Sequence, residues 1–133
     1  LGVSSQMLAG YLRGVIAQRL VRKLCTECKL ERPSTEDEIS LLQTIKQEAH
    51  ILYEPRGCSK CEFTGYQGRI AMAEWLVFDE QMDALLNQDK ILELRNYAYN
   101  KGFSPMLHAG LKAISKGLVD INEIERVIDL RKT

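Results

Sequence analysis

Four cysteines are the residues of this chain best suited to chemistry, and they fall into two Cys-x-x-Cys pairs. Cys25 pairs with Cys28, Cys58 pairs with Cys61, and residues 29–57 separate the two pairs. Two such pairs can present four thiolates at the corners of a tetrahedron, which is the arrangement used by structural zinc sites. We therefore predict a zinc site with these four ligands. No coordination position is left for water, so the metal is expected to be structural and not catalytic.

The long separation of the pairs bears on this prediction. Compact zinc ribbons place about 15–20 residues between their pairs, so a helix is expected inside this longer knuckle. Four buried or redox-active cysteines without a metal remain the alternative. Turn N–H groups are expected to bond the sulfurs. Six cations near the pairs are expected to offset the negative charge of a four-thiolate zinc site: Arg22, Lys23, Lys29, Arg32, Arg56 and Lys60.

Composition limits the classes of function that this chain can have. The 133 residues are 45% hydrophobic and 27% charged, which is typical of a globular domain. Eighteen Lys+Arg balance 18 Asp+Glu, and non-specific nucleic-acid binding requires a cationic surplus. No apolar run approaches the roughly 20 residues of a membrane span, and no basic start followed by an apolar signal core marks these residues as secreted. Because the chain starts at Leu1 and not at Met, we expect a fragment of a longer protein.

The chain divides into three segments. Residues 1–24 are predicted to be mostly one helix over 4–24, because they lack proline and their apolar residues recur at helical spacing. Residues 25–61 form the tetracysteine zinc-binding subdomain. Residues 62–133 combine a strand at 69–78 with a bundle of helices. The predicted fold is therefore mainly α with a short β element, a helical module with an inserted zinc knuckle.

Helix boundaries have local signals as well. Acidic residues 36–38 follow Ser34 and Thr35, which predicts a helix start inside the knuckle. Asp79 and Asp89 are predicted N-caps of two later helices. Gly102 and Gly117 are expected to end helices, and Asp120 with Glu123 is expected to begin the last one.

Two stretches around the cysteines carry a family resemblance. Residues 14–28 read GVIAQRLVRKLCTEC, and residues 57–69 read GCSKCEFTGYQGR. Together they closely resemble the C-terminal region of the type II secretion ATPase and type IV pilus assembly ATPase family. Residues 117–127 are similar to the closing motif of that family, although Val119 and Asp120 stand where threonines are usual.

The resemblance implies a hexameric bacterial motor on the cytoplasmic face of the inner membrane, driven by ATP hydrolysis. Its implied partners are the protein's own nucleotide-binding core, neighbouring subunits and an inner-membrane platform protein. The chain has no Gly-x-x-x-x-Gly-Lys-Ser/Thr loop, which binds nucleotide phosphates. ATP and Mg²⁺ are therefore expected only in the missing core, and no catalytic residue is assigned here.

Three polar residues are candidates for contacts with that core. On the predicted helix, Arg19 lies among apolar residues, and a charge there requires a partner. Arg19 either docks with Gln18 against the core of its own or the adjacent subunit, or it forms an ion pair with Glu74 or Glu123. Arg69, after the glycine turn, either contacts the core or a partner, or bonds turn carbonyls or a carboxylate such as Glu74.

Two other classes of protein compete with the motor module. A zinc-ribbon module that binds nucleic acid or protein would also use four cysteines, but for nucleic acid the neutral charge argues against it. A thioredoxin-like redox protein would place a single Cys-x-x-Cys in a strand–helix pattern, which the helical layout does not match.

Overall fold

In a computed structural model, residues 2–128 are described and form two compact units. One contains residues 2–17 with Glu74–Pro105, and the other contains Gln18–Ala73 with residues 106–128. Of the described residues, 38% are helical and 24% are in strands. The fold is mixed α/β with helix predominating, so the predicted helix-rich fold with a β element is confirmed, and its strand content is larger than expected.

The first unit is built around helices α1 (Ser5–Leu8), α3 (Glu80–Asn87) and α4 (Ile91–Asn100). As predicted, Asp79 caps α3, and its Oδ1 accepts a hydrogen bond from the Met82 N–H at 3.0 Å. Asp89, however, is not a cap, because Lys90 holds the N-cap position of α4. The buried core of the unit contains Met82, Leu85, Leu86, Leu94 and Ala98.

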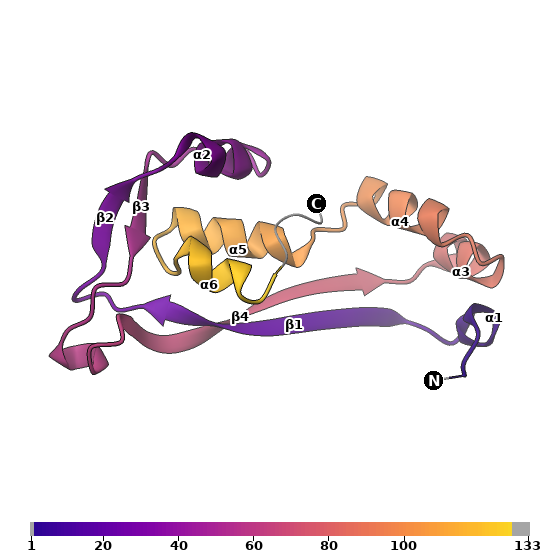
Figure 1. The fold of residues 1–133 in the computed structure, drawn as a ribbon. Coiled ribbons are helices and arrows are strands. Elements are labelled where there is room, and N and C mark those ends of the chain that lie inside the picture. Colours follow the sequence, from indigo (N-terminus) through magenta and orange to yellow (C-terminus); the bar gives the residue numbers. More distant parts are fainter. Residues whose placement is uncertain (1, 129–133) are drawn as a thin grey trace. The chain divides into compact units, whose positions relative to one another are not determined.

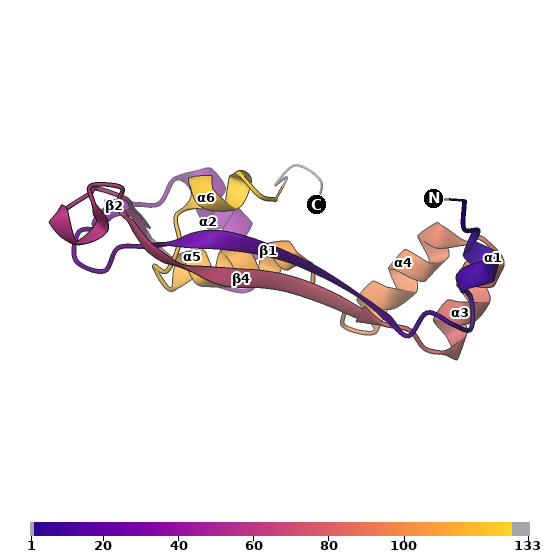
Figure 2. The same ribbon diagram turned by 90° about the horizontal axis from the view of Figure 1, so that it is seen from below.

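Two long strands contribute residues to both units. β1 (Gly14–Leu24) and β4 (Tyr66–Val77) form a two-stranded sheet and run in opposite directions (Figures 1 and 2). The strand predicted at 69–78 is thus confirmed and begins earlier. Near its end, Trp75 and Val77 are exposed.

The predicted helix over 4–24 is wrong from residue 9 onward. The helix α1 ends at Leu8, and two residues of poor helix propensity, Gly10 and Gly14, follow it. Val15 and Ile16 are β-branched and favour a strand, and pairing with β4 satisfies the backbone of β1. Apolar residues at helical spacing therefore did not reveal the strand, because its partner lies about fifty residues further along the chain.

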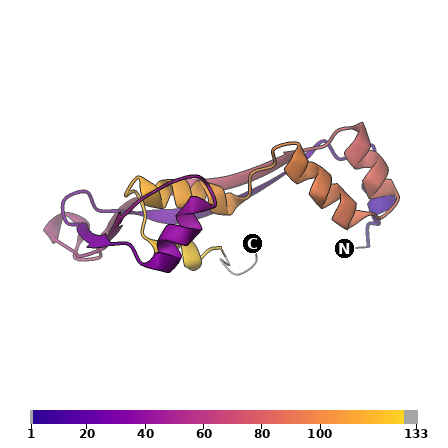
Figure 3. The same ribbon diagram turned by 90° about the horizontal axis from the view of Figure 1, so that it is seen from above.

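The second unit contains a hairpin that the sequence did not predict. β2 (Leu30–Pro33) pairs antiparallel with β3 (Ile51–Glu54), and Leu30 lies opposite Glu54. The helix predicted inside the knuckle is α2 (Glu36–Gln43), which connects these strands (Figure 3). The helix starts where expected, and its start is a capping box, in which the side chains of Thr35 and Glu38 each bond the other's backbone N–H.

Helices α5 (Met106–Ser115) and α6 (Ile121–Glu125) complete the second unit. The backbone N–H of Leu24, at the end of β1, donates to the Leu118 carbonyl at 2.8 Å. Gly117 ends α5 as predicted, with a φ of +63°. A Cβ there would lie 2.6 Å from two ring carbons of Tyr53, so this turn and β3 approach more closely than a side chain allows.

Gly117→Ala should lower the free energy of unfolding by about 3 kcal/mol, by combining the left-handed backbone cost of 1–2 kcal/mol with overpacking against Tyr53. Gly102→Ala is the matched control. Its φ is also positive, at +92°, but nothing lies within 4 Å of the added Cβ. It should therefore cost only about 1 kcal/mol. Urea unfolding followed by circular dichroism measures both variants, and equal losses would contradict the close approach.

Candidate metal centre

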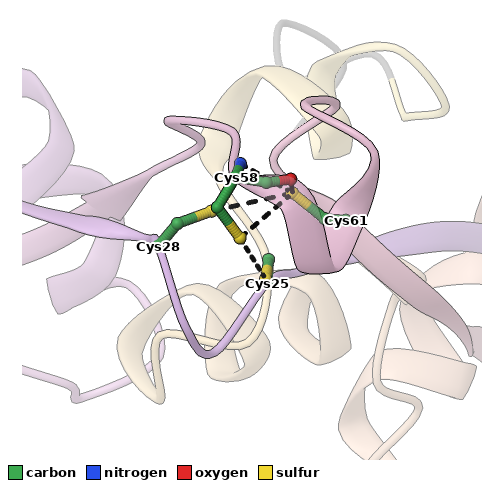
Figure 4. A group of neighbouring side chains, drawn as sticks. All are labelled: Cys25, Cys28, Cys58 and Cys61. Atoms are coloured by element: carbon green, nitrogen blue, oxygen red, sulfur yellow. Dashed lines mark hydrogen bonds between the residues drawn. The ribbon is translucent and has the colours of Figure 1, made fainter.

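The four cysteines meet at one point of the second unit. Cys25 and Cys28 lie on the loop that follows β1, while Cys58 directly precedes the 3₁₀ turn η1 (Ser59–Cys61) and Cys61 is its last residue. Their side chains point toward one another (Figure 4), and all four Sγ atoms lie within 4.8 Å of one another. A zinc ion needs at least three cysteine, histidine or acidic side chains whose ligand atoms lie close together. Within residues 2–128, these four cysteines meet that condition.

The sulfur–sulfur distances suit a tetrahedral metal ion. Cys25 Sγ lies 3.9 Å from Cys58 Sγ, which lies 3.8 Å from Cys61 Sγ, and Cys28 Sγ is 3.7 Å from Cys61 Sγ. A tetrahedron with Zn–S bonds of about 2.3 Å has sulfur–sulfur edges of about 3.8 Å. A disulfide would bring two sulfurs to about 2.05 Å, and all four cysteines are free.

Backbone N–H groups bond one of the sulfurs, as the sequence predicted. The N–H groups of Cys58 and Gly65 each donate to Cys61 Sγ at 3.2 Å. Gly65 has a φ of +79°, and a Cβ there would lie 2.5 Å from the Cβ of Pro55. Only glycine can bring its N–H to the sulfur at this position.

Cys61 and Cys28 differ in their pKa values, in part because of these N–H contacts. Burial alone would raise the pKa of Cys61, but hydrogen bonds from the N–H groups of Cys58 and Gly65 and from the thiols of Cys28 and Cys58 together outweigh it and lower that pKa to about 6. Burial raises the pKa of Cys28 to about 12, against a smaller opposite effect of a backbone hydrogen bond from Gly57. A bound cation would favour the thiolate form of both.

Three of the six cations expected to offset the charge of the cluster bind elsewhere. Lys29 Nζ donates to the Gly117 carbonyl at 2.7 Å and lies 4.2 Å from the centre of the Tyr53 ring. Arg22 and Arg32 form ion pairs with buried glutamates. These contacts hold the metal-binding loop and the β2–β3 hairpin against neighbouring elements.

Glu123 is the most heavily bonded of those glutamates. Its side chain is fully buried and accepts five hydrogen bonds, three from Arg22 and two from Arg126, at 2.7–3.1 Å. Arg22 and Arg126, not Arg19, are therefore the ion-pair partners of Glu123. Burial by itself would raise the pKa of Glu123, but these hydrogen bonds outweigh it and lower the pKa to about 2.

A second polar contact accompanies this ion pair. The Tyr66 hydroxyl donates to Asp120 Oδ1 at 3.0 Å, and the Arg22 guanidinium lies 4.0 Å from the centre of the Tyr66 ring. Burial, reinforced by the Asp120 carboxylate, raises the pKa of Tyr66 to about 12. Asp120 precedes α6 as predicted, but its side chain makes no capping hydrogen bond.

The residues expected to dock against a nucleotide core lie on the two long strands. Gln18 and Arg19 are on β1 and Arg69 is on β4, and all three are exposed. Arg19 Nη1 donates to the Gln18 carbonyl at 3.2 Å. The premise that Arg19 lies inside an apolar helix face is wrong, because the segment is a strand. Docking through these three residues stays a prediction.

Sequence reasoning missed two features that support the cluster. The pair Arg32–Glu38 had no signal beyond the acidic helix start, because Arg32 belongs to an unpredicted strand. Glu123 and Arg126 are spaced i, i+3, which is a recognisable helical pair. The bonds from Arg22 to the same carboxylate had no local signal, because they join residues 101 positions apart.

Comparison with known proteins relates the chain to bacterial transport machinery. Residues 1–126 match the family described as Type II/IV secretion system protein. The chain is 35% identical to the type IV pilus assembly ATPase TfpB of Acinetobacter baylyi, over 98% of this chain and 23% of that protein. It is 30% identical to the type II secretion system ATPase E of Vibrio cholerae, over 96% of this chain and 25% of that protein. The chain thus spans about a quarter of the length of these relatives.

Among residues 2–128, every helix is too short or too polar to cross a bilayer.

The low pKa of Glu123 predicts a pH-dependent loss of stability. Because its pKa in the folded chain is about 2, against an ordinary 4.5, its contribution is fully present above about pH 5. That contribution is lost as the pH falls toward 2. Glu123→Gln should lower the free energy of unfolding by about 2 kcal/mol at pH 7, less than for a fully buried pair because both arginines are half-exposed.

Urea unfolding from pH 7 to pH 3 measures this effect as the difference between parent and variant. The difference should shrink as the pH falls. Glu125→Gln, which changes an exposed glutamate of the same helix, is the control and should track the parent. A difference that stays constant across this pH range would contradict the assignment.

Proposed function

Because the chain belongs to the type II/IV secretion system protein family, we propose that it is the zinc-binding C-terminal module of a hexameric motor ATPase. The whole protein powers type II secretion or type IV pilus assembly. Its relatives support this proposal, since they include ATPases of both machines. The module itself is structural and transmits motion, whereas hydrolysis belongs to the rest of the protein.

Zinc is the cofactor that we assign to this module. Two observations carry the assignment: all four sulfurs lie within 4.8 Å of one another, and three sulfur–sulfur distances of 3.7–3.9 Å match the edges, of about 3.8 Å, of a four-thiolate zinc tetrahedron. Bound zinc would cross-link the loop of Cys25 and Cys28 to the turn of Cys58 and Cys61. With all four positions taken by sulfur, its role is structural.

ATP and Mg²⁺ are assigned to the part of the protein outside this chain. The 133 residues contain no phosphate-binding Gly-x-x-x-x-Gly-Lys-Ser/Thr loop. We place the hexamer on the cytoplasmic face of the bacterial inner membrane. Its partners there are its own nucleotide-binding core, neighbouring subunits and the membrane platform protein of the machine.

The zinc knuckle, residues 25–61, is suited to transmitting a movement. It carries a short helix and hairpin and is held by the sulfur cluster and by ion pairs such as Arg32–Glu38. Glu36, Asp37 and Lys60 are exposed on it. Mixed surface charges of this kind suit a polar contact that forms and breaks in each cycle.

Metal analysis tests the zinc assignment directly. The purified protein should contain one zinc per chain by mass spectrometry, and Cys58→Ser should reduce that content because three thiolates bind zinc less tightly than four. A zinc content near zero in freshly purified parent protein would overturn the assignment.

Chelation should also reveal how far the metal supports the fold, because binding free energy at a structural zinc site is folding free energy. Hydrogen exchange should increase across residues 25–69 and at residues 117–118, which bond Leu24 and Lys29. Helices α3 and α4 should keep their protection and serve as the internal control. Uniform protection after complete metal removal would contradict this prediction.

A triple variant of the full-length protein, with Glu36, Asp37 and Lys60 changed to alanine, tests the coupling role. All four cysteines stay intact, so the fold and the zinc content should not change. Secretion or piliation should fall strongly, while hexamer assembly and the basal ATPase rate should remain near those of the parent. Full secretion by a variant that folds and hydrolyses ATP normally would show that this surface is not the coupling contact.

A further inference from the structure

The four cysteine residues of the cluster differ in their exposure to solvent. Cys25 is fully buried, and Cys28 and Cys61 are 9% and 5% exposed. Cys58 is only half-buried, and the two residues that follow it, Ser59 and Lys60, are exposed. A small oxidant arriving from solvent therefore reaches Cys58 before the other three.

Cys58 also has a partner within reach. Cys58 Sγ lies 3.8 Å from Cys61 Sγ, and both belong to one Cys-x-x-Cys turn. This is the spacing at which redox-active pairs close a disulfide. The Sγ of Cys25 is 3.9 Å away, but a bond to it would join two separate loops.

We propose that Cys58 is a peroxide-oxidation site, at which a disulfide with Cys61 forms and zinc is released. The proposal rests on the zinc site proposed above. It makes the knuckle a reversible, redox-sensitive element, because the disulfide removes two of the four ligands at once.

The chemistry balances with hydrogen peroxide as the two-electron oxidant. The Cys58 thiolate attacks one peroxide oxygen, the O–O bond breaks, and the other oxygen leaves as water after taking a proton. The resulting sulfenic acid is attacked by the Cys61 thiolate. The S–S bond forms as the S–O bond breaks, and the departing hydroxide is protonated to a second water. Two thiolates have then lost two electrons in total, and the peroxide has gained them.

Loss of the thiolate at Cys61 also removes local contacts. Its Sγ accepts the N–H groups of Cys58 and Gly65, and a neutral disulfide sulfur is a weaker acceptor than a thiolate. The Gly65 carbonyl in turn accepts the N–H of Cys25 at 2.9 Å. Oxidation should therefore loosen both loops that hold the cluster.

Hydrogen peroxide added to the zinc-loaded full-length protein tests this inference. A chromogenic chelator follows zinc release, while differential alkylation and mass spectrometry map the thiols. We expect one zinc lost per Cys58–Cys61 disulfide formed. Cys25 and Cys28 should remain free thiols at half-release and act as the internal control. Dithiothreitol with added zinc should restore the metal content.

Cys61→His provides a second measurement, because imidazole can replace the lost ligand while no thiol remains to close the turn. Zinc release should slow several-fold, and dimedone should trap Cys58 as its sulfenic acid. If this variant binds no zinc, the disulfides mapped in the parent protein test the inference by themselves.

Three results would overturn the inference. These are a first disulfide that includes Cys28, zinc release without any disulfide, and zinc retention at peroxide doses that oxidise exposed methionines. A protein that holds no zinc before treatment fails at the earlier step, so it overturns the metal site and this inference with it. The zinc content at time zero therefore separates the two failures.

Discussion

Convergence of four sulfurs within 4.8 Å is the constraint on which the second unit depends. Two loops supply these sulfurs, one directly after β1 and one between β3 and β4. The segment between the two cysteine pairs must therefore leave the cluster and return to it. The β2–β3 hairpin and α2 make up this segment. Closing such a loop costs conformational entropy. A cross-link between the two loops would keep this segment closed.

A buried carboxylate links the last helix, α6, to the long strand β1, just as the sulfur cluster links its two loops. Glu123 joins α6 to β1 through Arg22, and Arg126 completes its set of donors. A carboxylate removed from water is costly unless its lone pairs are satisfied, and five donors satisfy them here. Lys29 adds a bond from the metal-binding loop to the end of α5. The cluster and the terminal helices are thus mechanically connected.

This connection suits the proposed role in a motor. A site with four sulfur ligands has no position for a substrate, so its contribution to a machine is stiffness. The exposed charges of the knuckle would then meet a partner while buried pairs keep its shape. The same thiolates that would stiffen the module can also be oxidised. Because Cys58 is less buried than the other three cysteines, we expect it to be the most sensitive to oxidation.

The sequence alone determined the features that are encoded locally. Cysteine spacing identified the cluster, and the acidic residues after Thr35 identified the start of α2. Asp79 marked the start of one helix and Gly117 the end of another. Each of these signals depends on residues a few positions apart. The family followed from motifs around the cysteines. Only the tertiary structure decided that residues 14–24 are a strand, that 30–33 pair with 51–54, and that Arg22 is the partner of Glu123. Each of these depends on backbone or charge partners far along the chain, and an apolar periodicity cannot show which distant segment satisfies them.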